Sequence, residues 1–269
     1  MKSEDFERIR MEMRLSKTQS KMLPRKYTKI GDVLILNIPD ALSDFEKEIG
    51  KAYMKVFKAK SVLKKGRISG EFRKPNFKLI AGKITETIHE ENKILYKLDL
   101  KEIMFSSGNI KERIRMARLL KKERVIDMFA GIGYYSLPIA KFCRSKVYAL
   151  EKNPIAFSYL CENIQLNKVE NLITPLNMDC RDFKGSADRV VMGYLKKTER
   201  FLPKAFEFVD EGFIIYHEAV FENLSHKKLI ERVRGIAKKY GRRFEFLDLR
   251  RIKKYSPGVW HVVLEFRVF

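Results

Sequence analysis

Short apolar runs alternate with segments of helical periodicity from residue 124 to the end of the chain. The apolar runs cover residues 125–127, 146–150, 173–177, 187–194 and 212–218. Helical segments lie between them, the clearest running from Ser136 to Phe142 and from Pro154 to Leu166. This alternation predicts a mostly parallel sheet. Two further runs, at 244–250 and 259–266, flank a Ser-Pro-Gly turn and predict an antiparallel hairpin at the sheet edge.

The first hundred residues have a different pattern, which predicts a smaller α+β domain. An apolar strand is followed by a helix whose start is marked by Ser43 and Glu46, spaced as in a capping box. Short β-type runs follow this helix, whereas residues 1–30 predict a short helix and then a basic loop. We therefore expect an N-terminal α+β domain over residues 1–105 and a second, α/β domain over residues 106–269.

The first strand of the second domain ends at Asp127 and leads into a turn that contains Gly131 and Gly133. Glycine adopts positive φ easily and lets a ligand approach the backbone. A strand, a glycine turn and a helix in this order direct the first backbone N–H groups of the helix towards a ligand. The spacing is G-x-G-x-x-S, so the third glycine of the dinucleotide fingerprint is missing and the motif alone is weak evidence.

Polar residues after the next strands strengthen the prediction of a nucleotide site. Ligands of open α/β sheets bind beyond the carboxyl ends of the strands. Glu151 follows the second strand, about twenty residues after the glycines, where a carboxylate can accept from both ribose hydroxyls. Asp179 follows the third strand and could accept from an adenine amino group, with the N–H of Cys180 beside it. Together these residues predict an adenosine site.

The adenosine could belong to NAD or to S-adenosylmethionine. NAD requires a helix start that is open to phosphate, but Tyr134, Tyr135 and Ser136 crowd that point. S-adenosylmethionine carries no phosphate and tolerates these residues. The hairpin at the end of the chain also suits a methyltransferase-like sheet. We therefore favour S-adenosylmethionine.

The charge of the chain predicts a polyanionic partner. The formal net charge is +22 and the isoelectric point is near 9.8. A lysine-rich surface can also reflect thermophily, but RNA or DNA is the simplest partner for so basic a chain. The first domain holds a basic strip that is a candidate for phosphate contacts, formed by Lys58, Lys60, Lys64, Lys65, Arg67, Arg73, Lys74 and Lys78.

Other features of the sequence set limits on the function. The three cysteines are far apart and form no C-x-x-C pair, which indicates a reducing cytoplasm and argues against a zinc site. The four histidines are scattered without ligand spacing, so we expect no metal. No apolar run approaches a membrane-spanning length, and the charged N-terminus does not look like a signal peptide. We expect a cytoplasmic monomer.

Four segments resemble a family of archaeal tRNA-Phe enzymes of the wyosine and wybutosine pathway, and the resemblance extends from about residue 30 to the end. The segments are residues 105–113, 127–133, 188–194 and 215–218. The closely related tRNA guanosine N1-methyltransferases look like F-S-P-R in the first segment and N-L-P in the third. This chain has Phe-Ser-Ser-Gly at 105–108 and Met-Gly-Tyr at 192–194, and also Tyr-His-Glu where those methyltransferases tend to have His-Tyr-Tyr. These differences favour the aminocarboxypropyltransferase branch.

The resemblance implies a class I methyltransferase-like, Rossmann-like sheet of seven strands with S-adenosylmethionine as co-substrate. It implies transfer of the 3-amino-3-carboxypropyl group to C7 of 4-demethylwyosine, next to the anticodon of tRNA-Phe, with release of methylthioadenosine. Ser107 and Arg113 would lie near the methionine arm, although spacing alone favours a surface position for Arg113. The adenosine half would contact the residues after the first three strands, namely Asp127, Phe129, Gly131, Glu151, Asp179 and Cys180.

Three functions therefore stay open. A tRNA guanine N1-methyltransferase on the same scaffold is the alternative enzyme, and a non-catalytic RNA-binding protein with a vestigial nucleotide pocket is the alternative class. No catalytic residue is assigned. Asp188, His217 and Glu218 are candidates for a general base, but a structural role is favoured for each.

Overall fold

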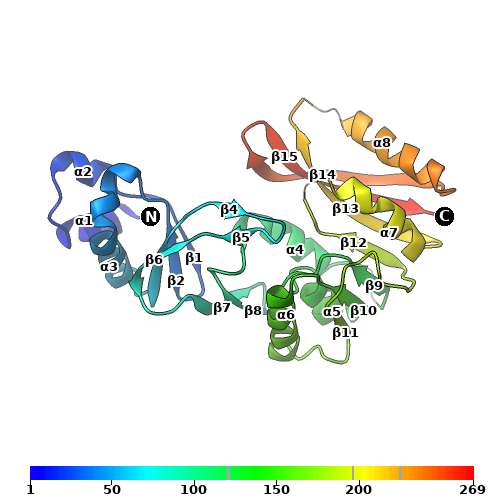
Figure 1. Ribbon diagram of the computed structural model, residues 1–269, viewed down its shortest axis with the longest axis horizontal. Helices are drawn as coiled ribbons and strands as arrows, with labels where there is room; N and C mark the ends of the chain where they lie inside the picture. Colours follow the sequence, from blue (N-terminus) through cyan, green and yellow to red (C-terminus); the bar gives the residue numbers. More distant parts are fainter. Residues whose placement is uncertain (120–121, 196, 224–225) are drawn as a thin grey trace. The chain divides into compact units, whose positions relative to one another are not determined.

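The computed structural model describes residues 1–119, 122–195, 197–223 and 226–269. The chain forms two compact units, Met1–Ser107 and Gly108–Phe269, and each is described by itself below. Figure 1 shows the elements of both units. We call them unit 1 and unit 2.

Unit 1 combines three helices with a four-stranded sheet in the order β1-β2-β3-β6, and β4-β5 and β7-β8 form two separate hairpins. Its elements are α1 (Ser3–Met11), α2 (Lys17–Lys21), β1 (Tyr27–Ile30), β2 (Val33–Leu36), η1 (Asp40–Phe45), α3 (Glu46–Val56), β3 (Ser61–Lys64), β4 (Ile68–Ser69), β5 (Lys74–Pro75), β6 (Lys78–Gly82), β7 (Glu86–Glu91) and β8 (Ile94–Asp99). A short 3₁₀ turn, η2 (Ser107–Asn109), follows. The core of unit 1 lies between the sheet and helices α1 and α3.

The capping box predicted at Ser43 is wrong. Ser43 lies within η1, and α3 begins at Glu46 without a side-chain cap. The Glu46 carboxylate instead accepts hydrogen bonds from Lys64 and Lys78, each at 2.7 Å, which lowers the pKa of Glu46. A capping box does form earlier, between Ser16 and Gln19 at the start of α2, within residues 1–30, where only one helix was predicted. Two nearby ammonium groups bind a carboxylate more strongly than one backbone N–H does.

Unit 2 is a seven-stranded sheet in the order β11-β10-β9-β12-β13-β15-β14. The first five of these strands are parallel, whereas β15 is antiparallel to both β13 and β14. The elements are α4 (Ile110–Met116), β9 (Arg124–Asp127), α5 (Ser136–Cys143), β10 (Lys146–Leu150), α6 (Pro154–Leu166), β11 (Ile173–Leu176), β12 (Arg189–Met192), η3 (Thr198–Phe201), α7 (Leu202–Phe208), β13 (Gly212–Phe221), α8 (His226–Lys239), β14 (Phe244–Ser256) and β15 (Val259–Val268). The predicted mostly parallel sheet with a terminal antiparallel hairpin is confirmed.

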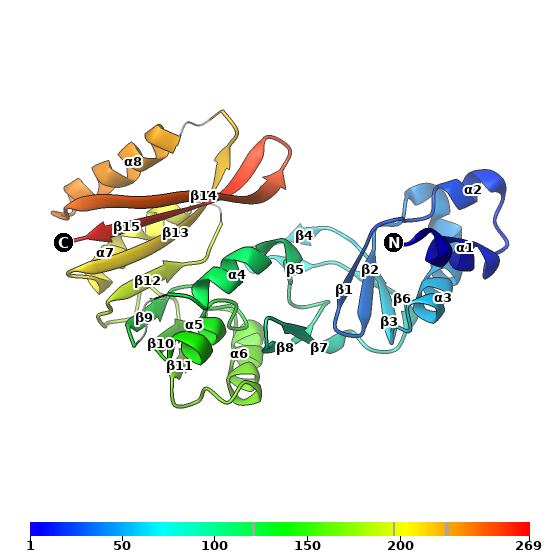
Figure 2. The same cartoon turned by 180° about the vertical axis from the view of Figure 1, so that it is seen from behind.

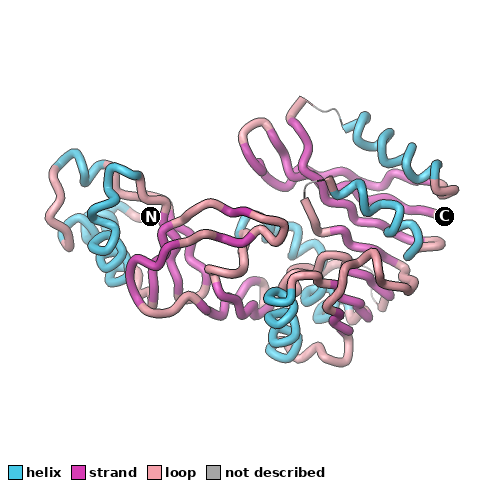
Figure 3. Tube along the Cα trace, viewed as in Figure 1, coloured by secondary structure: helices cyan, strands magenta, loops and turns pink. Residues whose placement is uncertain are grey.

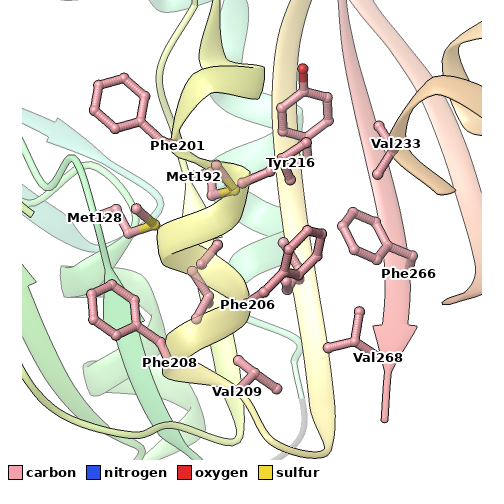
Figure 4. Packing of buried hydrophobic residues seen from close by; sticks show 14 of the residues in the cluster. Met128, Met192, Phe201, Phe206, Phe208, Val209, Tyr216, Val233, Phe266 and Val268 are labelled. Atoms are coloured by element: carbon pink, nitrogen blue, oxygen red, sulfur yellow. The ribbon is translucent and has the colours of Figure 1, made fainter. Parts of the chain in front are cut away.

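One face of this sheet is packed by apolar side chains from α7 and α8. Phe206 and Phe208 of α7 point towards the strands, where they meet residues such as Tyr216 and Phe266 (Figure 4). Phe206 and Phe266 are fully buried and lie edge to face, with ring centroids 6.5 Å apart. A fully buried side chain of this kind stabilises the folded protein by about 1.5–3 kcal/mol, because its apolar area is removed from water.

The other face carries a buried network of charged side chains under α4. The Arg189 guanidinium, at the start of β12, donates to Glu123 at 2.8 Å and to Glu265 of β15 at 2.9 Å. Glu265 also accepts from Arg115 of α4 at 2.9 Å, and Arg115 donates to Glu112 of the same helix. Figure 2 shows α4 and α5 on this side. The network fixes α4 on the sheet.

Candidate active site

Asp127 holds the glycine turn from inside the protein. Its side chain is fully buried at the end of β9. One carboxylate oxygen accepts from the Phe129 N–H at 3.3 Å, and the other accepts from the Ser136 hydroxyl at 2.7 Å. Burial raises the pKa of Asp127 to about 6, although these hydrogen bonds oppose the shift. Asp127 therefore joins the two ends of the turn, and contact with a ligand through its carboxylate stays a prediction.

Both glycines of the turn have positive φ, +57° at Gly131 and +98° at Gly133. A Cβ atom at Gly133 would lie 2.7 Å from the side chain of Leu137, so the close packing of the turn on α5 also requires glycine. The Gly131 N–H points to the next strand and donates to Glu151 at 2.7 Å.

Glu151 follows β10 and is held by backbone groups on two sides. One carboxylate oxygen accepts from Gly131 and the other accepts from the Asn153 N–H at 2.7 Å, at the start of α6. Burial raises the pKa of Glu151. Each carboxylate oxygen can accept a second hydrogen bond, so this arrangement leaves capacity for the hydroxyls of a ribose.

Asp179 and Cys180 lie after β11. The Asp179 carboxylate accepts two hydrogen bonds from the Arg181 guanidinium, at 2.9 and 2.6 Å, and these lower its pKa. Asp179 is therefore ionised and already paired. Burial raises the pKa of the Cys180 thiol to about 12, so Cys180 can offer a ligand its backbone N–H rather than a thiolate.

Phe129 has an aromatic partner in the loop after β12, a pairing that the sequence prediction did not state. Its ring stacks on Tyr194, from the loop after β12, with centroids 5.1 Å apart. Phe201 lies edge to face against Phe129 at 4.9 Å. The position of Tyr194 directly after the fourth strand was the available signal, because that loop must lie at the same sheet edge as the glycine turn.

Glu218 of β13 holds the loop after β12 through hydrogen bonds. Its buried carboxylate accepts from the Thr198 N–H at 2.9 Å and from the Tyr216 hydroxyl at 2.7 Å. The Thr198 hydroxyl in turn donates to the carbonyl of Tyr194 at 2.9 Å. Through Thr198 these contacts connect Glu218 to the loop that carries Tyr194, and the structural role favoured for Glu218 stays a prediction.

Gly193 and His217 both contact the ring of Tyr135, at the start of α5. A Cβ atom at Gly193 would lie 2.6 Å from this ring. The ring of His217 lies 5.1 Å from it, and His217 Nδ1 lies 3.0 Å from His261 Nε2 in a buried hydrogen bond. Burial lowers the pKa of His217, so this histidine is neutral. The Met-Gly-Tyr segment thus fits closely against Tyr135.

The expectation from spacing that Arg113 is a surface arginine is wrong. Arg113 is 3% exposed in the first turns of α4, so it is held inside unit 2. Ser107 is exposed and is the last residue of unit 1. The predicted roles of both residues at the methionine arm stay predictions.

The described residues contain no group of three or more His, Cys, Asp or Glu side chains arranged to hold a metal ion. Across the same part of the chain, no helix combines the length and apolar character needed to cross a membrane.

Comparisons with known proteins identify similar proteins along nearly the whole chain. A family model for the TRM5/TYW2 methyltransferase domain matches residues 87–246, and one for the TYW2 N-terminal domain matches residues 8–85. The chain is 49% identical to the tRNA(Phe) (4-demethylwyosine(37)-C(7)) aminocarboxypropyltransferase of Pyrococcus horikoshii, over 93% of this chain and 91% of that protein. It is 51% identical to the protein of that name from Methanocaldococcus jannaschii, over 89% of this chain and 96% of the relative.

Solved structures and more distant relatives belong to the same group. The crystal structure of P. horikoshii TYW2 in complex with MeSAdo has a TM-score of 0.91 and 45% identity, over 98% of this chain and 99% of that one. The tRNA (guanine(37)-N(1))-methyltransferase Trm5b of Pyrococcus abyssi is 39% identical, over 92% of this chain and 76% of its own length.

The sheet order, the glycine turn and the acid after the second strand define a class I S-adenosylmethionine-dependent transferase fold. Within that class, the chain belongs to the TRM5/TYW2 family. The predicted fold class and family are therefore confirmed.

Proposed function

We propose that this protein transfers the 3-amino-3-carboxypropyl group of S-adenosylmethionine to C7 of 4-demethylwyosine, next to the anticodon of tRNA-Phe. The identity of about one half to two archaeal aminocarboxypropyltransferases carries this proposal, since it extends along nearly the whole chain. The guanine N1-methyltransferase relative is less similar, at 39% identity.

The cofactor would lie across the carboxyl edge of β9, β10 and β11. Glu151 accepts from the ribose hydroxyls, and the Gly131 N–H that now donates to Glu151 keeps that carboxylate in place. Asp179 accepts from the adenine amino group while it remains bonded to Arg181. Phe129 packs against the adenosine half, and the Cys180 N–H donates to the base. Asp127 contributes by holding the turn.

The reaction follows from which carbon of the sulfonium faces the acceptor. In the proposed transfer, C7 of the base attacks the methylene carbon of the amino-acid arm that is bonded to sulfur. A new C–C bond forms, the C–S bond breaks with its electron pair going to sulfur, and methylthioadenosine leaves. The ring then loses the proton at C7. Orientation decides the product, because a bound donor reacts at the carbon that is held in line with the nucleophile.

Ser107 and Arg113 are proposed to hold the methionine arm. Burial of Arg113 supports this role, since a buried guanidinium suits a carboxylate partner better than an exposed one does. The fit of Gly193 against Tyr135 further supports the choice of branch. Gly193 stands where the N-L-P segment of the methyltransferases has leucine, and a side chain at this position would meet the ring of Tyr135.

Unit 1 is proposed to contact the tRNA. Of the eight residues of the basic strip, four are ion-paired, namely Lys60 with Asp32, Lys64 and Lys78 with Glu46, and Lys74 with Glu102. Lys58, Lys65 and Arg67 are exposed. Phosphate contacts therefore rest mainly on these three.

A donor labelled separately on the methyl and on the carboxypropyl carbons tests the proposal. Incubation with tRNA-Phe that carries 4-demethylwyosine should place only the carboxypropyl label in the RNA, and the product nucleoside should gain the mass of that group. Methyl label in the RNA would reject the proposal in favour of guanine N1-methylation. No detectable binding of S-adenosylmethionine in calorimetry would instead favour a non-catalytic RNA-binding protein.

A further inference from the structure

The antiparallel strands of unit 2 extend well beyond the parallel ones. β12 pairs with β13 only as far as Tyr216, whereas β13 continues to Phe221 and stays paired with β15 down to Val259. The five extra residues correspond to about 16 Å of strand. They project from the carboxyl edge, the edge at which Asp127 and Met192 end their strands. Figure 3 shows this extension together with the hairpin of β14 and β15.

The end of this hairpin carries cations and aromatic rings. Arg251 and Lys254 lie over the ring of Trp260, at 5.4 and 5.7 Å from its centroid, and both are exposed. Phe221, at the end of β13, is 70% exposed. One acid lies nearby, Glu222, which accepts from the Trp260 indole at 3.1 Å and lies 3.8 Å from the Lys254 ammonium in an exposed ion pair. Cations that bind phosphate beside an exposed ring on which a base can stack are typical of RNA-binding surfaces.

The same hairpin borders the segment proposed to hold the methionine arm. A Cβ atom at Gly108 would lie 2.8 Å from Cδ of Lys253, so the Lys253 side chain occupies the space that this glycine leaves open. Gly108 directly follows Ser107 and stands where the F-S-P-R segment of the methyltransferases has arginine. On β15, His261 is opposite Lys253 and hydrogen-bonds His217, which packs on Tyr135. The hairpin is thus connected to the glycine turn through side-chain contacts.

We propose that the end of the β14–β15 hairpin is a docking surface for the substrate RNA. Arg251 and Lys254 bind backbone phosphates, and Phe221 stacks on an unpaired base near the nucleotide that is modified. The identity of the RNA as tRNA-Phe rests on the proposed function, but the chemistry of the surface requires only RNA. A protein partner would use the exposed aromatic ring without needing the two cations.

The chain has a single tryptophan, and both cations lie over its ring, at 5.4 and 5.7 Å from the centroid, so its fluorescence reports directly on the hairpin. Titration of the full-length protein with tRNA-Phe should change the Trp260 emission in a saturable way. Arg251→Gln/Lys254→Gln should weaken tRNA binding about tenfold and reduce the slope of log affinity against log salt by about 1.5, because two phosphate contacts are lost. Binding by the double variant is measured by filter retention, independently of fluorescence.

Lys238→Gln/Lys239→Gln is the matched control. It removes the same charge from two exposed positions at the C-terminal end of α8. It should bind tRNA like the wild type, apart from a small nonspecific effect. Phe221→Ser should weaken binding without changing the salt slope. Equal affinity and slope in the hairpin and control variants would overturn the proposal, as would an unchanged Trp260 emission at saturating tRNA.

The labelled-donor reaction separates this proposal from the proposed function. The hairpin variant should retain its donor affinity in calorimetry and should transfer the same group, with a raised KM for tRNA and an unchanged kcat. Transfer of methyl instead would reject the aminocarboxypropyl assignment and leave the docking surface intact. An unchanged KM for tRNA would reject the docking surface and leave the reaction intact.

Discussion

The two faces of the unit 2 sheet are built from different kinds of side chain. The face under α7 and α8 is apolar, whereas the face under α4 contains buried charges such as Arg189. Apolar packing stabilises in proportion to the area removed from water, but a buried charge is tolerated only while it keeps its partners. The charged side also carries His217 and Tyr135, which support the glycine turn. The comparison indicates that the charged side depends on specific partners, whereas the apolar side depends on the area that it buries.

Arg189→Met should give the largest effect on stability. The substitution leaves Glu123 and Glu265 without a guanidinium that is now buried between them, and such a change typically costs about 3–5 kcal/mol. Chemical denaturation measures the loss. Arg124→Gln is the control, because its ion pair with Asp188 is exposed and should cost less than about 1 kcal/mol. Equal losses for the two variants would contradict the distinction between buried and exposed pairs.

The apolar face was predictable from the sequence and the charged face was not. Periodicity alone places Phe208 or Phe266 in a core, because apolar spacing reports which side of an element is buried. By contrast, Arg189 meets Glu123 and Glu265 across 66 and 76 residues, and nothing local marks such pairs. Burial of Arg113 was missed for the same reason.

The candidate site divides in the same way. The glycine turn and Glu151 follow from a local motif at a fixed spacing, so the sequence placed them side by side, and they are hydrogen-bonded. The stacking of Tyr194 on Phe129 depends on the strand order, which brings the loop after β12 next to β9. The false capping box at Ser43 shows the limit of local motifs, because Glu46 instead accepts hydrogen bonds from two lysines that are distant in sequence.

Asp127 should make the folded protein less stable as pH rises, the opposite of what a carboxylate with a lowered pKa does. Its pKa is raised to about 6 in the folded protein, above the ordinary aspartate value, so the folded state binds the proton more tightly than the unfolded state does. Its contribution to stability is therefore present at low pH and falls as pH rises from about 4 to about 6, by up to about 3 kcal/mol. Aspartates with lowered pKa values, such as Asp179, act in the opposite direction.

The comparison of wild type with Asp127→Asn isolates this contribution. The free energy of unfolding is measured for both from pH 4 to pH 7, and the other carboxylates cancel in the difference. The substitution itself sets a difference in the free energy of unfolding at pH 4. From there, the free energy of unfolding of the variant should rise relative to that of the wild type as pH increases. A difference that stays constant with pH would show that Asp127 titrates at its ordinary value.

Glu151→Ala should act on ligand binding. In the proposed site the ribose would lose its acceptor, and the Gly131 N–H loses its partner, so we expect S-adenosylmethionine affinity to fall about 30-fold or more. Calorimetry measures this loss. Glu151→Gln retains one acceptor oxygen and should lose less, whereas Glu162→Ala, which removes a half-buried carboxylate elsewhere on α6, should bind like the wild type. Equal affinity of Glu151→Ala and wild type would remove the ribose assignment.

Gly235→Ala should have the smallest effect of these variants, and it should increase the free energy of unfolding. Gly235 lies inside α8, on the apolar side, and no atom lies within 4 Å of the position of an added Cβ. Alanine is the better helix former, so the variant should gain about 0.5–1 kcal/mol. The same change at Gly133 should destabilise by more than this, because φ is +98° and the Cβ would meet Leu137 at 2.7 Å. If both variants lost stability, the glycine of α8 would have a packing role that its open surroundings do not explain, and the division between the two sides of the sheet would weaken.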